Sequence, residues 1–127
     1  MKEQISKNLR PAAVGFRVKS GRAIAVLVGS SKSWPQVLDC RVIQLSDPSQ
    51  PETIQPYHAR MGKLEENNVK IKRRTAIIQR ASQKSVTQML KEYDGKGYKI
   101  QGAGLVVGSL IDPASIGNPH VRAHALE

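Results

Sequence analysis

Three histidines are the residues of this chain whose types and spacing could do chemistry. His120 and His124 lie four positions apart, and His58 lies far upstream. Two imidazoles four apart on a helix share one face, a spacing that can bind Zn²⁺ together with a third ligand such as His58. The stretch lacks the glutamate of the H-E-x-x-H pattern, and Arg122 disfavours a bound cation. We therefore expect no metal and no cofactor. The candidate ligand site comprises His58, Asn118, His120, Arg122 and His124.

General acid–base catalysis is an alternative use of the same imidazoles. No nucleophile with a paired base is recognisable in the sequence. Asp47 and Asp112 each precede a proline, which is typical of turns. Asp39 lies in a predicted strand, and one carboxylate does not make a metal site. The sequence therefore leans against an enzyme, with a histidine-based hydrolase as the alternative.

Cationic side chains form the second candidate site. Lys and Arg outnumber Asp and Glu by 20 to 10, which gives a formal net charge of +10. Such an excess favours a polyanionic partner, because phosphate contacts need cations without strict geometry. The alternative is a solvated face of an amphipathic helix, since no aromatic residues are interleaved to stack bases. The predicted nucleic-acid contacts are Arg17, Lys19, Arg22, Lys70, Lys72, Arg73, Arg74 and Arg80.

The composition is that of one folded domain, because 127 residues with 39% hydrophobic content can bury a core. We expect a flexible N-terminus over residues 1–10 and a single domain over residues 11–127. The single cysteine, Cys40, excludes an intrachain disulfide and is predicted to be an inert core residue. The absence of a signal-like or spanning apolar run favours a cytoplasmic location without membrane contact.

Alternating apolar residues predict three strands in the first part of the chain. Residues 12–18 and 23–29 flank a turn that contains Gly21, as in a β-hairpin. The second run is apolar on both faces, so we expect it to be covered on both sides. Residues 35–45 are rich in β-branched side chains and predict a third strand at the edge of an antiparallel meander.

A helical region follows the meander, either as one long element or as two. Residues 57–68 are compatible with a short helix that Gly62 weakens. Residues 69–93 predict a stronger helix with one apolar stripe, and the glycines of "DGKG" end it. The stripe is formed by Ile78, Ala81, Val86, Met89, Leu90 and Tyr93.

The last part of the chain predicts a strand and a helix. Residues 98–111 read as a buried strand, and a helix before such a strand implies a crossover and parallel pairing. Asn118 is a suitable N-cap and Pro119 suits the first helical position. The chain ends within this helix, so we expect a C-terminal truncation.

The predicted order, β-β-β-α-β-α, is that of the first part of the ribonuclease H-like α/β fold. The stretch "VGFRVKSGRAIAVLV" resembles the opening hairpin of Holliday-junction resolvases and actin-like ATPases. The stretch from Leu90 to Glu127 is similar to the resolvase segment of helix end, central strand, Asn-containing loop and Ala-rich helix. The segment "SLIDPASIGNPHVRAHALE" also resembles a family of bacterial proteins, and this resemblance implies no activity.

The resemblance implies a two-metal nuclease centre built from acidic residues, and the matching positions do not supply them. Arg17 stands where those nucleases have the first-strand aspartate, and residues 98–111 contain no Asp or Glu. We therefore expect a ribonuclease H-like domain without the catalytic acids, which binds nucleic acid or another polyanion. The alternatives are the histidine-based hydrolase and a protein-interaction module or homodimer that uses an exposed edge strand.

Overall fold

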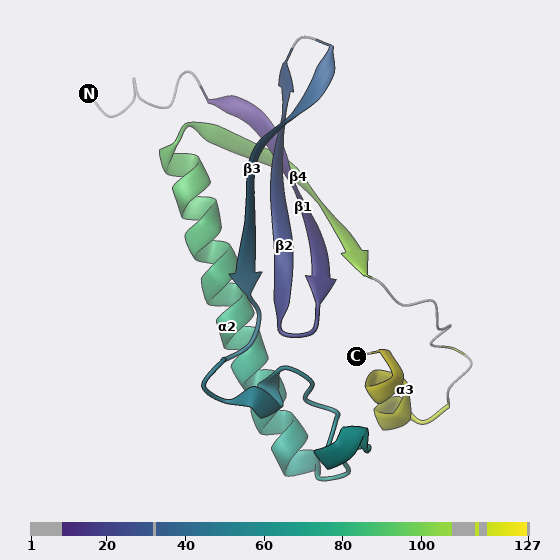
Figure 1. Cartoon of the computed structure of the whole chain (residues 1–127). Helices are drawn as coiled ribbons and strands as arrows, with labels where there is room; N and C mark the ends of the chain where they lie inside the picture. The colour runs from purple at the N-terminus through teal and green to yellow at the C-terminus, as the bar shows by residue number, and fades with distance from the viewer. Residues whose placement is uncertain (1–8, 32, 108–113, 115–116, 127) are drawn as a thin grey trace.

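A computed structural model describes residues 9–31, 33–107, 114 and 117–126 as an α/β arrangement of one mixed sheet and one long helix (Figure 1). The helix, α2, packs on one face of the sheet and connects the third strand to the fourth. Two short 3₁₀ turns lie between the third strand and α2. The elements are β1 (Arg10–Lys19), β2 (Arg22–Ser31), β3 (Trp34–Gln44), the turns Pro51–Thr53 and Arg60–Gly62, α2 (Asn68–Gly95), β4 (Tyr98–Val107) and α3 (Pro119–Leu126).

The strand order is β3-β2-β1-β4. β2 pairs antiparallel with β1 and β3, whereas β4 pairs parallel with β1. Gly21 makes the β1–β2 turn with a φ of 78°, a left-handed conformation that glycine adopts without steric cost. The predicted α/β class, the meander, the edge position of the third strand and the parallel fourth strand are therefore confirmed.

The core lies between the sheet and α2. Alternate residues of β1 and β2 point toward the helix, and Met89 and Tyr93, one turn apart, fill the space against Val14 and Leu27. Tyr93 and Leu27 are fully buried. The buried cluster is formed by Ala12, Val14, Ala23, Ala25, Leu27, Ile43, Met89 and Tyr93.

α2 begins where the sequence predicts a helix. The Asn67 side chain accepts hydrogen bonds from the backbone N–H groups of Val69 and Lys70, at 3.0 and 3.2 Å, and so caps the first turn. The predicted short helix over residues 57–68 is wrong: only the 3₁₀ turn Arg60–Gly62 forms there. Met61 and Gly62 have φ values of 60° and 73°, which an α-helix cannot accommodate.

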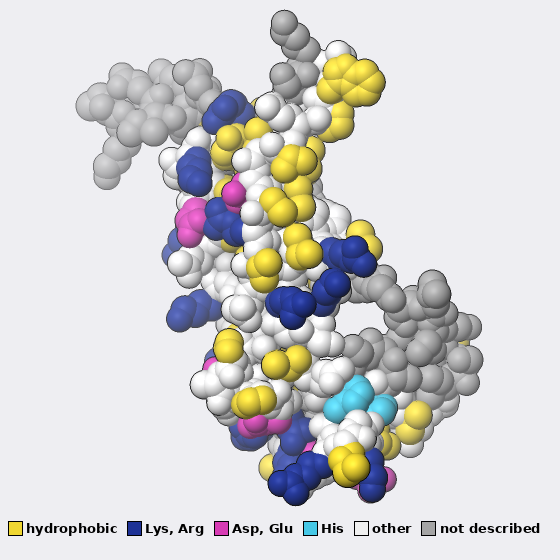
Figure 2. Space-filling view, viewed as in Figure 1, with side chains coloured by type: hydrophobic (Ala, Val, Ile, Leu, Met, Phe, Trp, Pro, Cys, Tyr) yellow, Lys and Arg dark blue, Asp and Glu magenta, His cyan; other side chains and the backbone are white. Residues whose placement is uncertain are grey.

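The sheet face opposite α2 carries side chains that the sequence was expected to bury. Within the described residues, the prediction that β2 is covered on both sides is wrong, because α2 covers only one face. Cys40 is exposed on the other face and is not the predicted core residue. β4 is an edge strand with Leu105 and Val106 exposed, so the prediction of a buried strand is also wrong. Figure 2 shows hydrophobic side chains along the face in view.

A polar cluster fastens the C-terminal half of α2 to β3. The Tyr93 hydroxyl and the Arg41 Nε each donate to Asp39 Oδ2, both at 2.7 Å, and Arg41 also pairs with Glu92. The Tyr93 hydrogen bond and then the Arg41 hydrogen bond lower the pKa of Asp39. Burial and the bond to Asp39 raise the pKa of Tyr93 to about 12. The cluster therefore favours an ionised Asp39 and a neutral Tyr93.

We predict that Tyr93→Phe lowers the free energy of unfolding at neutral pH by about 1 kcal/mol, because Asp39 loses a donor. Tyr93 has an ordinary pKa of 10.0 that folding raises to about 12, so its hydroxyl stabilises the fold below pH 10. That contribution disappears as pH rises from 10 to 12. Urea unfolding across this range should show wild type and Tyr93→Phe converging.

Tyr98→Phe is the matched control, because no hydrogen bond of the Tyr98 hydroxyl occurs among the described residues. At neutral pH it should lower the free energy of unfolding by less than Tyr93→Phe does. A constant gap between wild type and Tyr93→Phe up to pH 12 would contradict the assignment.

Candidate functional site

The carboxyl ends of β1 and β4 lie at one end of the sheet, beside the loop between β3 and α2 and beside α3 (Figure 1). The β1–β2 turn packs directly on this loop. The Gly21 carbonyl accepts from the Leu45 N–H at 2.9 Å and from the Ser46 hydroxyl at 3.3 Å. A Cβ at Gly21 would lie 3.0 Å from Ser46 Oγ and 3.2 Å from Ile54. Turn and loop thus form one surface, called here the carboxyl-end surface.

The loop owes its fixed path to short polar side chains. Asp47 accepts from the N–H and hydroxyl of Ser49 and from the Gln50 side chain. Buried Thr53 donates to the Gln50 carbonyl at 2.8 Å and receives the Asp47 N–H at 3.1 Å. The predicted turn role of Asp47 is confirmed, whereas Asp112 lies outside the described residues.

Arg17, Lys19 and Arg22 share one exposed face at the end of the β1–β2 hairpin. Arg17 and Lys19 are two residues apart in β1, and Lys19 lies directly opposite Arg22 in the strand register. All three side chains are exposed, and no ion pair to any of them occurs within the described residues. Like charges placed opposite each other across strands repel, so an anion bound here would stabilise the hairpin.

The five predicted cations of α2 do not share one environment. Lys70, Lys72 and Arg80 are exposed. Arg73 is half-exposed and pairs with Glu52 at 3.1 Å. Arg74 is only 8% exposed and pairs with Glu65 at 2.9 Å, so it is not available to an external phosphate.

Arg74 is instead the anchor of the loop. Its Nη1 donates to the carbonyls of Pro56 and His58 at 3.0 and 3.4 Å. Glu65 also accepts from the Asn67 N–H at 3.2 Å, so the same carboxylate orders the start of α2. That backbone hydrogen bond, together with the charge of Arg74, lowers the pKa of Glu65.

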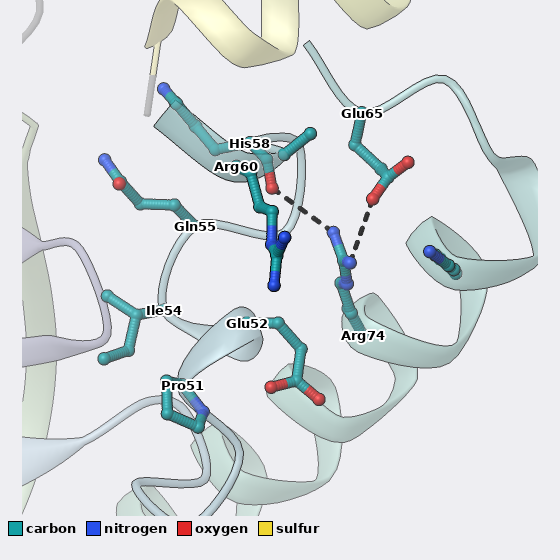
Figure 3. A pocket seen from close by; sticks show the side chains of 10 residues that line it. Pro51, Glu52, Ile54, Gln55, His58, Arg60, Glu65 and Arg74 are labelled. Carbon is teal, nitrogen blue, oxygen red and sulfur yellow. Dashed lines mark hydrogen bonds and ion pairs between the residues drawn. The ribbon is translucent and has the colours of Figure 1, made fainter. Parts of the chain in front are cut away.

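A cavity of about 800 Å³ opens between this loop and the first turns of α2 (Figure 3). Most of its lining residues are charged or polar, and the Arg60 side chain extends into it. The lining residues are Pro51, Glu52, Ile54, Gln55, His58, Ala59, Arg60, Glu65, Lys70 and Arg74. The volume falls within the range of ligand pockets.

The structure brings the predicted histidines to one place without forming a metal centre. The rings of His58 and His124 stack with centroids 3.8 Å apart, and His120 lies 6.3 Å from the Tyr57 ring. His124 Nε2 lies 2.9 Å from the Gly62 carbonyl oxygen. In the described ranges, no three His, Cys, Asp or Glu side chains are grouped to hold a metal ion. The histidines therefore join α3 to the loop.

Asn118 acts as the predicted N-cap of α3. Its Oδ1 accepts from the N–H groups of His120 and Val121 at 2.9 and 3.3 Å. Arg122 belongs to α3 by its backbone, but its side chain lies outside the described residues. The set predicted as a ligand site thus comprises a helix cap and a ring stack, together with one side chain that the structure does not describe.

Two residues of the carboxyl-end surface had no assigned role in the sequence reading. Glu65 occupies the position two residues before the N-cap, and an acid so close to a helix start is a usable sequence signal. No sequence signal of this kind identifies Arg60. The direction of its side chain depends on the left-handed backbone of Met61 and Gly62, which follow it.

No protein-family model matches the chain, and no match to it was found among curated proteins or solved structures. None of the helices in the described ranges is long and apolar enough to cross a membrane.

We predict that Arg74→Ala lowers the melting temperature by about 10 °C, because it leaves Glu65 and two carbonyls without their buried donor. Arg73→Ala is the matched control at the preceding residue, where the ion pair is exposed. It should lower the melting temperature by no more than about 3 °C. Differential scanning calorimetry measures both. Equal shifts for the two variants would show that Arg74 is not the anchor of the loop.

Proposed function

We propose that this chain is a nucleic-acid-binding domain that contacts the phosphate backbone with the carboxyl-end surface. The observation that carries the proposal is the exposed set Arg17, Lys19 and Arg22 on one sheet face, with Lys19 opposite Arg22. Their mutual repulsion is relieved by phosphates, and the net charge of +10 extends the attraction over a longer range. Figure 2 shows Lys and Arg side chains gathered below the hydrophobic side chains of the sheet.

The arrangement supports binding without two-metal hydrolysis. Arg17 pairs with Val106 across the parallel β1–β4 pair, where the resemblance places metal-binding acids. A guanidinium there repels a divalent cation and attracts a phosphate. The strand order and the parallel pair are compatible with the ribonuclease H-like core that the sequence suggested, which we retain as part of the proposal.

The test is binding of a fluorescent duplex, measured by anisotropy at 50 and 200 mM salt. We expect affinity to fall steeply with salt, because bound cations release counterions from the phosphates. Arg17→Ala with Arg22→Ala should weaken binding about tenfold and reduce the salt slope by about 2. Absence of binding at low salt would refute the proposal.

The matched control is Lys84→Ala with Lys91→Ala. It removes the same charge from exposed positions farther along α2. This double variant should retain nearly all of the affinity. An equal loss in both double variants would show that net charge alone, without a defined surface, accounts for binding.

A further inference from the structure

The cavity between the loop and α2 has more positive than negative charge available to a ligand. Its two carboxylates are already engaged, Glu52 with Arg73 at 3.1 Å and Glu65 with Arg74 at 2.9 Å. Arg60 extends into the space (Figure 3), and Lys70 lines it from the first turn of α2. Neither Arg60 nor Lys70 makes a side-chain hydrogen bond or ion pair within the described part of the chain. Two cations are therefore left for a ligand.

The Arg74 guanidinium adds positive charge to the cavity wall. The Arg74 side chain is 9% exposed, and its two Nη atoms are engaged by Glu65 and by backbone carbonyls. Its Nε is buried and has no acceptor among the described residues. Because this nitrogen is closed off from the cavity, Arg74 contributes charge to the wall and no direct contact to a ligand.

The start of α2 adds little to this charge. Its first turn contains no acidic residue, but the Glu65 carboxylate accepts from the Asn67 N–H, and Asn67 caps the N–H groups of Val69 and Lys70. An anion in the cavity would therefore meet mainly the side-chain charges of Arg60 and Lys70.

We propose that this cavity binds a phosphomonoester, held by Arg60 and Lys70. A phosphomonoester carries between one and two negative charges at neutral pH, which matches two cations better than the single charge of a backbone diester. The volume of about 800 Å³ leaves room for the group that carries the phosphate. The inference rests on the proposed function where the source is a terminal phosphate of nucleic acid, and a free phosphomonoester is the other source.

The experiment compares oligonucleotides of one sequence that end in a 5′-phosphate, a 3′-phosphate or hydroxyls alone, with AMP as the free phosphomonoester. We expect one phosphorylated end to bind at least about fivefold more tightly than the hydroxyl ends, since it adds a charge-assisted contact. Arg60→Ala should abolish this difference and AMP binding, and Arg60→Lys should restore part of both. Lys91→Ala, an exposed cation elsewhere on α2, should leave both unchanged.

The outcomes separate the two proposals. Equal binding of all three oligonucleotides, with no AMP binding, overturns the phosphomonoester site and leaves backbone binding intact. AMP binding that depends on Arg60, without oligonucleotide binding, supports the site and refutes the nucleic-acid proposal. A phosphate preference that survives Arg60→Ala and Lys70→Ala also overturns the site, because the contact then lies elsewhere.

Discussion

The buried pair of Arg74 and Glu65 organises the loop between β3 and α2 in this protein. An ion pair out of water is favourable only when further hydrogen bonds offset the loss of hydration, and here the carbonyls of Pro56 and His58 supply them. The pair thereby fixes the path of the loop between β3 and α2. The loop places His58 against α3, and it places the Arg60 side chain in the cavity. The Arg74–Glu65 pair therefore positions both the His58 ring that stacks on α3 and the Arg60 side chain in the cavity.

The long helix is fastened at two separated points, with the apolar core between them. Arg74 holds its N-terminal part to the loop, while Tyr93 and Glu92 hold its C-terminal part to β3 through Asp39 and Arg41. α2 therefore has a fixed position on one face of the sheet. The opposite face carries the cations of the β1–β2 hairpin, and no helix among the described residues covers it.

Local patterns in the sequence predicted the elements well but not their surroundings. Period-two alternation identified the hairpin, the apolar stripe identified α2, and the Asn118 cap identified the start of α3, because each depends on neighbours within a few residues. The burial of Cys40 was wrong, because alternation shows which residues share a face but not whether another layer covers that face. Whether another layer covers a sheet face depends on the tertiary structure.

The candidate site was predictable only in part, for the same reason. Arg73 and Arg74 are adjacent in a basic run, and nothing local separates an exposed cation from a buried anchor. Their difference arises from the path of the loop, which turns at the left-handed Met61 and Gly62 to bring Glu65 to Arg74. The contact of the hairpin cations with nucleic acid stays a prediction, whereas the predicted histidines dock α3 on the loop.

The distribution of acids argues that the basic character of this end is more than solubility. A solvated surface usually mixes charges of both signs, so that few cations lack a nearby carboxylate. Here most carboxylates of the described residues are used in holding the structure together. The engaged acids are Asp39, Asp47, Glu52, Glu65 and Glu92. Because these acids hold α2 and its loop, none of them pairs with Arg17, Lys19 or Arg22 of the hairpin, which supports the proposed attraction of the hairpin for phosphate.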